Sequence, residues 1–115
     1  MRIVFFGKGK RGLVCLQKLR LQKENVLLVI CQHSDPSLHS FKEFAKESNI
    51  EISCPADPND ASAINKLESV DADLFILAGY GMILGKRCIS IPKMHCINLH
   101  GGKLPEYRGS SPMNW

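Results

Sequence analysis

Three side chains that could do chemistry alternate near the end of the chain, at Cys96, Asn98 and His100. Residues two positions apart in a β-strand point to the same face, so we expect these three side chains to project together. An imidazole can move a proton, and an amide N–H can donate to the oxygen of a tetrahedral intermediate, as acyl transfer requires. A histidine satisfied by a local hydrogen bond would show the same spacing, so the pattern alone leaves both interpretations open.

A zinc site built from Cys88, His95, Cys96 and His100 is a weaker interpretation. Because neighbours in a strand face opposite ways, His95 and Cys96 do not readily share one tetrahedral ion. We therefore predict no metal site. The remaining two histidines have no partner at ligand spacing and are expected to face solvent.

A second candidate is the glycine-rich turn at residues 7–12, whose three glycines follow the spacing G-x-G-x-x-G. The amides of such a turn can hold an anion at a helix N-terminus, and three basic residues lie within it. A dinucleotide site also needs an acidic residue at the end of the second strand, where residues 32–34 are Gln, His and Ser. NAD therefore fits poorly, and the basic trio is equally compatible with a solvated loop.

Apolar runs alternate with segments of helical spacing, and these elements must position the candidate residues. Strands are predicted at residues 3–6, 26–31, 50–52, 74–78 and about 94–99; helices at 13–23, after 35–37, after 57–60 and near 84–88. This alternation predicts an α/β fold with a Rossmann-like parallel sheet and flanking helices. Ligands of such sheets bind beyond the carboxyl ends of the strands, so the segments just after residues 6, 31, 78 and 99 are the informative ones.

Size and composition fit one ordinary globular domain of 115 residues, with 44% hydrophobic and 23% charged residues. The net charge of +4 is compatible with an anionic substrate or a nucleic acid and establishes neither. Five cysteines without a CxxC pair argue against a disulfide framework and favour the reducing cytoplasm. No apolar run is long enough for a signal peptide or a membrane span, so we expect no membrane partner.

The segment from Asn98 to Gly109 reads N-L-H-G-G-K-L-P-E-Y-R-G. It resembles the motif N-x-H-x-S-L-L-P-x-Y-R-G of the folate-dependent formyltransferases. The likeness extends to residues 3–7, 33–36 and 78–84, and residues 111–115 are most similar to the branch that modifies sugar nucleotides.

The resemblance implies transfer of a formyl group from the cosubstrate 10-formyltetrahydrofolate to a primary amine. Asn98 and His100 match the family's catalytic asparagine and histidine. Met82, Ile83 and Leu84 match the segment whose backbone holds the pterin ring. The preferred acceptor is a nucleotide-linked amino sugar; the alternatives are a methionyl-tRNA formyltransferase, with a nucleic-acid partner, or a non-catalytic folate- or nucleotide-binding module.

The sequence also departs from the family pattern. Gly102 and Lys103 replace the usual Ser and Leu, and no aspartate follows Asp73, although the family has a catalytic aspartate beyond the motif. We therefore expect residues 1–115 to be the N-terminal part of a catalytic domain, truncated at its C-terminal end and with little activity alone. Its open sheet edge is expected to favour a homo-oligomer, and the likeness implies a cis Leu104–Pro105 bond.

Overall fold

Strands and helices alternate along the chain in the predicted order. The structure, a computed structural model, describes residues 1–99. The strands are β1 (Arg2–Gly7), β2 (Asn25–Ile30), β3 (Glu51–Ser53), β4 (Leu74–Ala78) and β5 (His95–Leu99). The helices are α1 (Gly9–Leu21), α2 (Leu38–Ser48), α3 (Ala61–Val70) and α4 (Lys86–Ile89).

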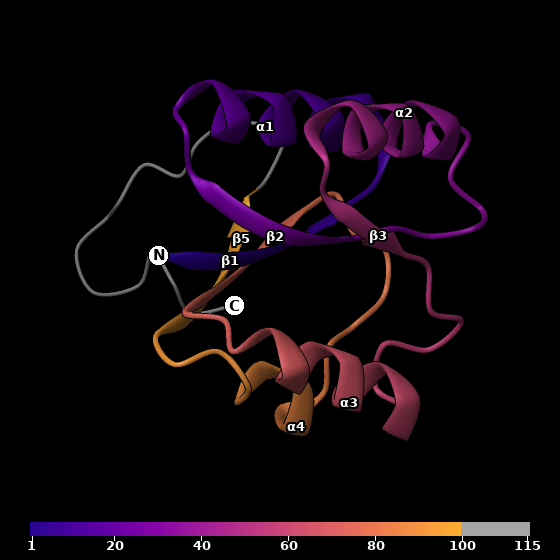
Figure 1. Cartoon of the computed structure of the whole chain (residues 1–115). Helices are drawn as coiled ribbons and strands as arrows, with labels where there is room; N and C mark the ends of the chain where they lie inside the picture. The colour runs from indigo at the N-terminus through magenta and orange to yellow at the C-terminus, as the bar shows by residue number, and fades with distance from the viewer. Residues whose placement is uncertain (100–115) are drawn as a thin grey trace.

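The five strands form one parallel sheet in the order β3-β2-β1-β4-β5. Helices α1 and α2 cover one face of the sheet, and α3 and α4 cover the other (Figure 1). The chain adds strands on one side of β1 first and then crosses to the other side. The predicted Rossmann-like α/β fold is therefore confirmed.

The central strand β1 shows why the sheet is buried on both faces. Ile3 and Phe5 belong to the core cluster under α1 and α2, whereas Val4 and Phe6 belong to the cluster under α3 and α4. All four are at most 2% exposed. A continuous apolar run is what a strand needs when helices cover both of its faces.

Two helix starts differ from the predictions. Helix α1 begins at Gly9, inside the predicted turn, because the buried carboxylate of Asp35 accepts a hydrogen bond from the Gly9 amide at 2.9 Å. A carboxylate is favourable at a helix N-terminus, where amides are unpaired. The fourth predicted helix lies slightly later, at Lys86–Ile89.

Two predictions fall outside the described residues. They are the position of His100 and the cis bond expected at Leu104–Pro105. These remain predictions.

Candidate functional site

A cavity of about 240 Å³ opens at the carboxyl ends of β4 and β5, on the sheet face that carries α4. It brings together Asn98 and the predicted pterin-binding residues Met82, Ile83 and Leu84, from segments well separated in the sequence. Its other lining residues are Leu77, Tyr80, Gly81, Ile89, Cys96 and Ile97. The lining is mostly apolar with one side-chain amide, which suits a flat ring system whose edge is polar.

Asn98 is the cavity-lining residue that carries a side-chain amide. Asn98 pairs in register with Leu77 of β4 and is half-buried. Within residues 1–99 its side chain makes no hydrogen bond. Cys96, two residues earlier, also lines the cavity, as the period of a strand requires.

The side chains of Met82, Ile83 and Leu84 differ in exposure, but the main chain of all three carries N–H groups. Leu84 is 6% exposed, whereas Ile83 is 86% exposed. Across the described part of the chain, the N–H groups of all three residues lack a backbone partner. Within this part of the chain, these N–H groups remain able to donate to water or to a ligand.

Two polar side chains from other parts of the chain bond the main chain of residues 81–85. Neither was identified as a site residue in the sequence analysis. Gln32 follows β2 and accepts a hydrogen bond from the Gly81 amide at 2.5 Å. Asn59, between β3 and α3, donates to the Ile83 carbonyl at 2.8 Å and accepts from the Gly85 amide at 2.6 Å. The only sequence signal for Gln32 was its place just after a buried strand; Asn59 carried none, because it lies in a turn.

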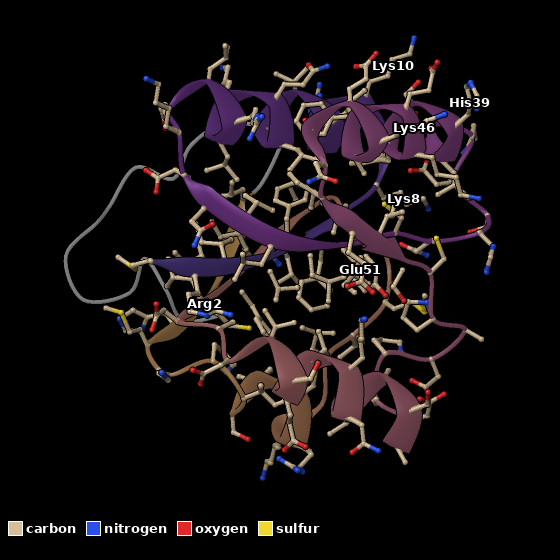
Figure 2. The ribbon with its side chains drawn as sticks, viewed as in Figure 1. Arg2, Lys8, Lys10, His39, Lys46 and Glu51 are labelled. Atoms are coloured by element: carbon tan, nitrogen blue, oxygen red, sulfur yellow. The ribbon has the colours of Figure 1, made fainter. Side chains whose placement is uncertain are left out.

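The second candidate, the turn at residues 7–12, has a carboxylate at the start of its helix. The Asp35 carboxylate already bonds the Gly9 amide at the start of α1, and a phosphate there would meet its negative charge. The nearby crevice between β1 and β4 is closed, because the Lys8 amide donates to the Ala78 carbonyl at 3.1 Å. Lys10 lies at the outer surface of the helix layer and Lys8 lower, beside the sheet (Figure 2).

The cysteine beside the cavity is a poor nucleophile. Burial, and to a smaller extent the nearby Cys88, raises the pKa of Cys96 from its ordinary value of 9.0 to about 12. The reactive form of cysteine is the thiolate, and a thiol with this pKa holds very little of it at neutral pH. The cavity therefore offers an amide and main-chain groups rather than a cysteine for covalent chemistry.

Three of the residues considered for zinc, Cys88, His95 and Cys96, lie within residues 1–99, and they do not form a metal-binding group there. Cys88 and Cys96 lie in the core, whereas His95 is exposed at the start of β5. Among residues 1–99 no three His, Cys, Asp or Glu side chains gather closely enough to hold a metal ion. His33 and His39 are exposed, as expected, and His39 pairs with Glu43 at 3.3 Å.

Within the same residues, no helix has the length and apolar character needed to cross a membrane. Cys31, Cys54, Cys88 and Cys96 are free thiols.

Comparison with known proteins gives one consistent result. A model of the formyl transferase family, described as "Formyl transferase", matches residues 1–115. Similar curated proteins are the methionyl-tRNA formyltransferases of Clostridioides difficile and Clostridium acetobutylicum, each 36% identical, and of Acetivibrio thermocellus, 34% identical. Each alignment covers 100% of this chain but only 40%, 39% and 39% of those proteins respectively, so the chain spans about two fifths of their length. Because the family match covers every residue, the chain belongs to the formyl transferase family of enzymes.

Proposed function

We propose that the cavity at the ends of β4 and β5 binds the pterin ring of 10-formyltetrahydrofolate, and that the protein transfers its formyl group to the amine of a methionyl-tRNA. The observation that carries the proposal is the meeting of Asn98 with the main chain of Met82–Leu84 around one cavity. The donor supplies the formyl carbon.

The size of the cavity supports binding of a ring rather than a whole folate. Pockets that enclose drug-sized ligands run from roughly 300 to 1,000 Å³, and this cavity holds about 240 Å³. A pterin edge alternates donors and acceptors, so it could pair with the amides of Met82–Leu84, which have no backbone partner among residues 1–99. Apolar contacts would come from the ring's faces, against side chains such as Leu77 and Ile89.

Asn98 has the chemistry that the transfer needs. When the acceptor amine attacks the formyl carbon, negative charge develops on the formyl oxygen. The Asn98 N–H would donate to that oxygen, and His100 would move the proton that leaves the amine. The bond between the carbon and the folate nitrogen then breaks, and that nitrogen takes up a proton, giving a formylated amine and tetrahydrofolate.

The acceptor preference changes after the comparisons. The similar curated proteins are named for methionyl-tRNA, so the amino sugar preferred from residues 111–115 gains no support, and the tRNA alternative is favoured. Charge is compatible with this, since seven basic residues precede the first acidic one, Glu24. Phosphate contacts by such residues supply much of the affinity for nucleic acids.

The proposal also covers the place of this chain in a larger domain and its compartment. Residues 1–115 would be the N-terminal part of a catalytic domain, as the resemblance implies. The free thiols of Cys31, Cys54, Cys88 and Cys96 favour a reducing compartment such as the cytoplasm.

The proposal is tested in two steps with tetrahydrofolate and with two acceptors. We expect tetrahydrofolate to bind residues 1–115 and to shift the amide NMR signals of Met82, Ile83 and Leu84 more than those of α1. We expect the protein that carries this sequence to formylate methionyl-tRNA and not a nucleotide-linked amino sugar. Absence of tetrahydrofolate binding would refute the site, whereas folate binding without transfer to either acceptor would favour a non-catalytic binding module.

A further inference from the structure

The loop between β4 and α4 is held in place by side chains from two other parts of the chain. Asn59 makes two hydrogen bonds to its main chain, to the carbonyl of Ile83 and the amide of Gly85. Gln32 makes a third, with the Gly81 amide. These contacts join segments 24 to 49 residues apart in the sequence, so they fix the loop to the body of the fold.

The two bonds of Asn59 imitate the pairing of a neighbouring strand. In a parallel ladder, a residue bonds the carbonyl of one residue and the amide two positions later on its partner strand. Asn59 does this with its side-chain amide, at Ile83 and Gly85. Leu84, between these two residues, lines the cavity, so the two bonds fix the main chain on either side of a lining residue.

The orientation of the Asn59 amide is itself fixed. The Asp57 carboxylate accepts from the Asn59 main-chain amide at 2.9 Å and from its side-chain nitrogen at 3.3 Å. A carboxylate accepts only, so it determines which end of the Asn59 amide is the donor. The donor end then meets the Ile83 carbonyl and the acceptor end meets the Gly85 amide.

The contact of Gln32 is equally close. A Cβ atom added at Gly81 would lie 2.9 Å from the side-chain oxygen of Gln32, which no ordinary contact allows. Gln32 is only 8% exposed, and a buried polar side chain is retained at a cost unless it is bonded. The loop is thus held at its start by a buried side chain and at its end by an exposed one.

We propose that Asn59 is a positioning residue for folate recognition: it holds the main chain of Met82–Leu84 in the form that pairs with the pterin edge. This inference rests on the proposed function, because it assigns the cavity to the same ligand. Asn59 does not line the cavity and touches no reacting atom; it acts through Ile83 and Gly85.

The test compares the affinities of three variants for tetrahydrofolate. Each variant of residues 1–115 is titrated with tetrahydrofolate in a calorimeter. Asn59→Ala removes both bonds, and Asn59→Asp keeps the acceptor for Gly85 while setting a negative oxygen against the Ile83 carbonyl. The matched control is Asn65→Ala, an exposed asparagine of α3. Asn59 is exposed, so its variants are expected to fold, and urea unfolding checks this.

We expect both Asn59 variants to weaken tetrahydrofolate binding about tenfold or more. Without one or both of the Asn59 hydrogen bonds, the loop is no longer held in the form that binds. Asn65→Ala should bind like the wild type. Amide hydrogen exchange at Gly85 should accelerate in Asn59→Ala and stay slow in Asn59→Asp, because only the latter keeps its acceptor.

The outcomes separate the two proposals. If the wild type binds tetrahydrofolate and Asn59→Ala binds it equally well, the positioning role is wrong while the site stands. If the wild type does not bind, the proposed function fails and this inference fails with it. A loss of affinity that merely follows a loss of folded protein in the urea titration would also overturn the inference, since a general structural role would then explain it.

Discussion

At the scale of single residues, Asn98 combines partial burial with an amide that has no hydrogen-bond partner within residues 1–99. In the proposed reaction, its N–H would donate to the charge that develops on the formyl oxygen. We predict that Asn98→Ala lowers kcat for formyl transfer about 10²- to 10³-fold, the usual cost of losing one oxyanion donor, with little change in the KM for the folate. Steady-state kinetics of the protein that carries this sequence measure both constants.

Asn98→Asp is the sharper companion variant, because it has the same shape but carries an acceptor and a negative charge. It should lose at least as much activity as Asn98→Ala. Equal activity of Asn98→Asp and the wild type would show that Asn98 does not stabilise developing negative charge.

Tyr80 carries a hydroxyl group that is buried and has no hydrogen-bond partner among the described residues. Its ring packs edge-on against Phe6, with centroids 5.3 Å apart. We predict that Tyr80→Phe leaves the free energy of unfolding unchanged or raises it by about 1 kcal/mol, since an unsatisfied hydroxyl costs free energy when buried. Urea unfolding measures this, and a loss of more than about 1 kcal/mol would reveal a partner for the hydroxyl.

At the scale of elements, the turn after β4 depends on close contact between two backbones. Gly79 has φ +77°, and a Cβ atom there would lie 2.6 Å from the Lys8 carbonyl oxygen. Gly9 has the same φ, but a Cβ atom there would meet nothing within 4 Å. Substituting alanine at Gly9 therefore tests backbone strain alone, whereas the same substitution at Gly79 adds a steric clash.

We predict that Gly9→Ala costs about 1–2 kcal/mol of stability, from the left-handed backbone alone. Gly79→Ala should cost a further 1–3 kcal/mol or so, because the backbone of Lys8 cannot move aside as a flexible side chain could. Urea unfolding of both variants gives the difference directly. Equal losses would mean that the loop after β4 shifts freely, which would also weaken its assignment as a rigid ligand platform.

Sequence reasoning predicted the elements well because each depends on local pattern. Runs such as residues 74–78 are apolar on both faces, and this requires cover by helices on both sides, whatever the details. The predicted start of α1 was wrong because the carboxylate that bonds the Gly9 amide belongs to Asp35, which lies 26 residues from Gly9 in the sequence. No local pattern at residues 7–12 announces a carboxylate supplied from the end of the next strand.

The candidate site was predictable to the extent that it resembles a known motif. Asn98 and Met82–Leu84 came from that likeness, and the structure places them around one cavity. Asn59 could not be found in this way, because its role depends on the three-dimensional approach of the β3–α3 turn to the loop after β4. A single asparagine in a turn has many ordinary reasons to be there.

At the scale of the whole molecule, buried thiols couple stability to alkaline pH. Burial raises the pKa of Cys31 and of Cys96 to about 12, and that of Cys88 to about 11, from an ordinary value of 9.0. A group whose pKa is raised by folding stays protonated in the folded state while it ionises in the unfolded one. Stability is therefore fully present below pH 9 and is lost as the pH rises from 9 towards 12.

We predict that the free energy of unfolding of this protein is flat with respect to these thiols from pH 7 to 8.5 and falls above pH 9. Each such thiol contributes a slope of up to about 1.4 kcal/mol per pH unit. Urea titrations under reducing conditions measure the slope, and Cys88→Ala should make it shallower. An unchanged stability between pH 9 and 10.5 would contradict the burial of these thiols.

The hold of Asn59 and Gln32 on the loop after β4 has a consequence for inhibitors. A compound that reads the main chain of Met82–Leu84 meets atoms that every amino acid possesses, so exchanging those side chains would leave the contacts in place. Mutations that weaken binding of such an inhibitor would instead have to change Asn59 or Gln32. In the proposed site, the same mutations would weaken binding of the folate. Resistance at this site would therefore carry a fitness penalty.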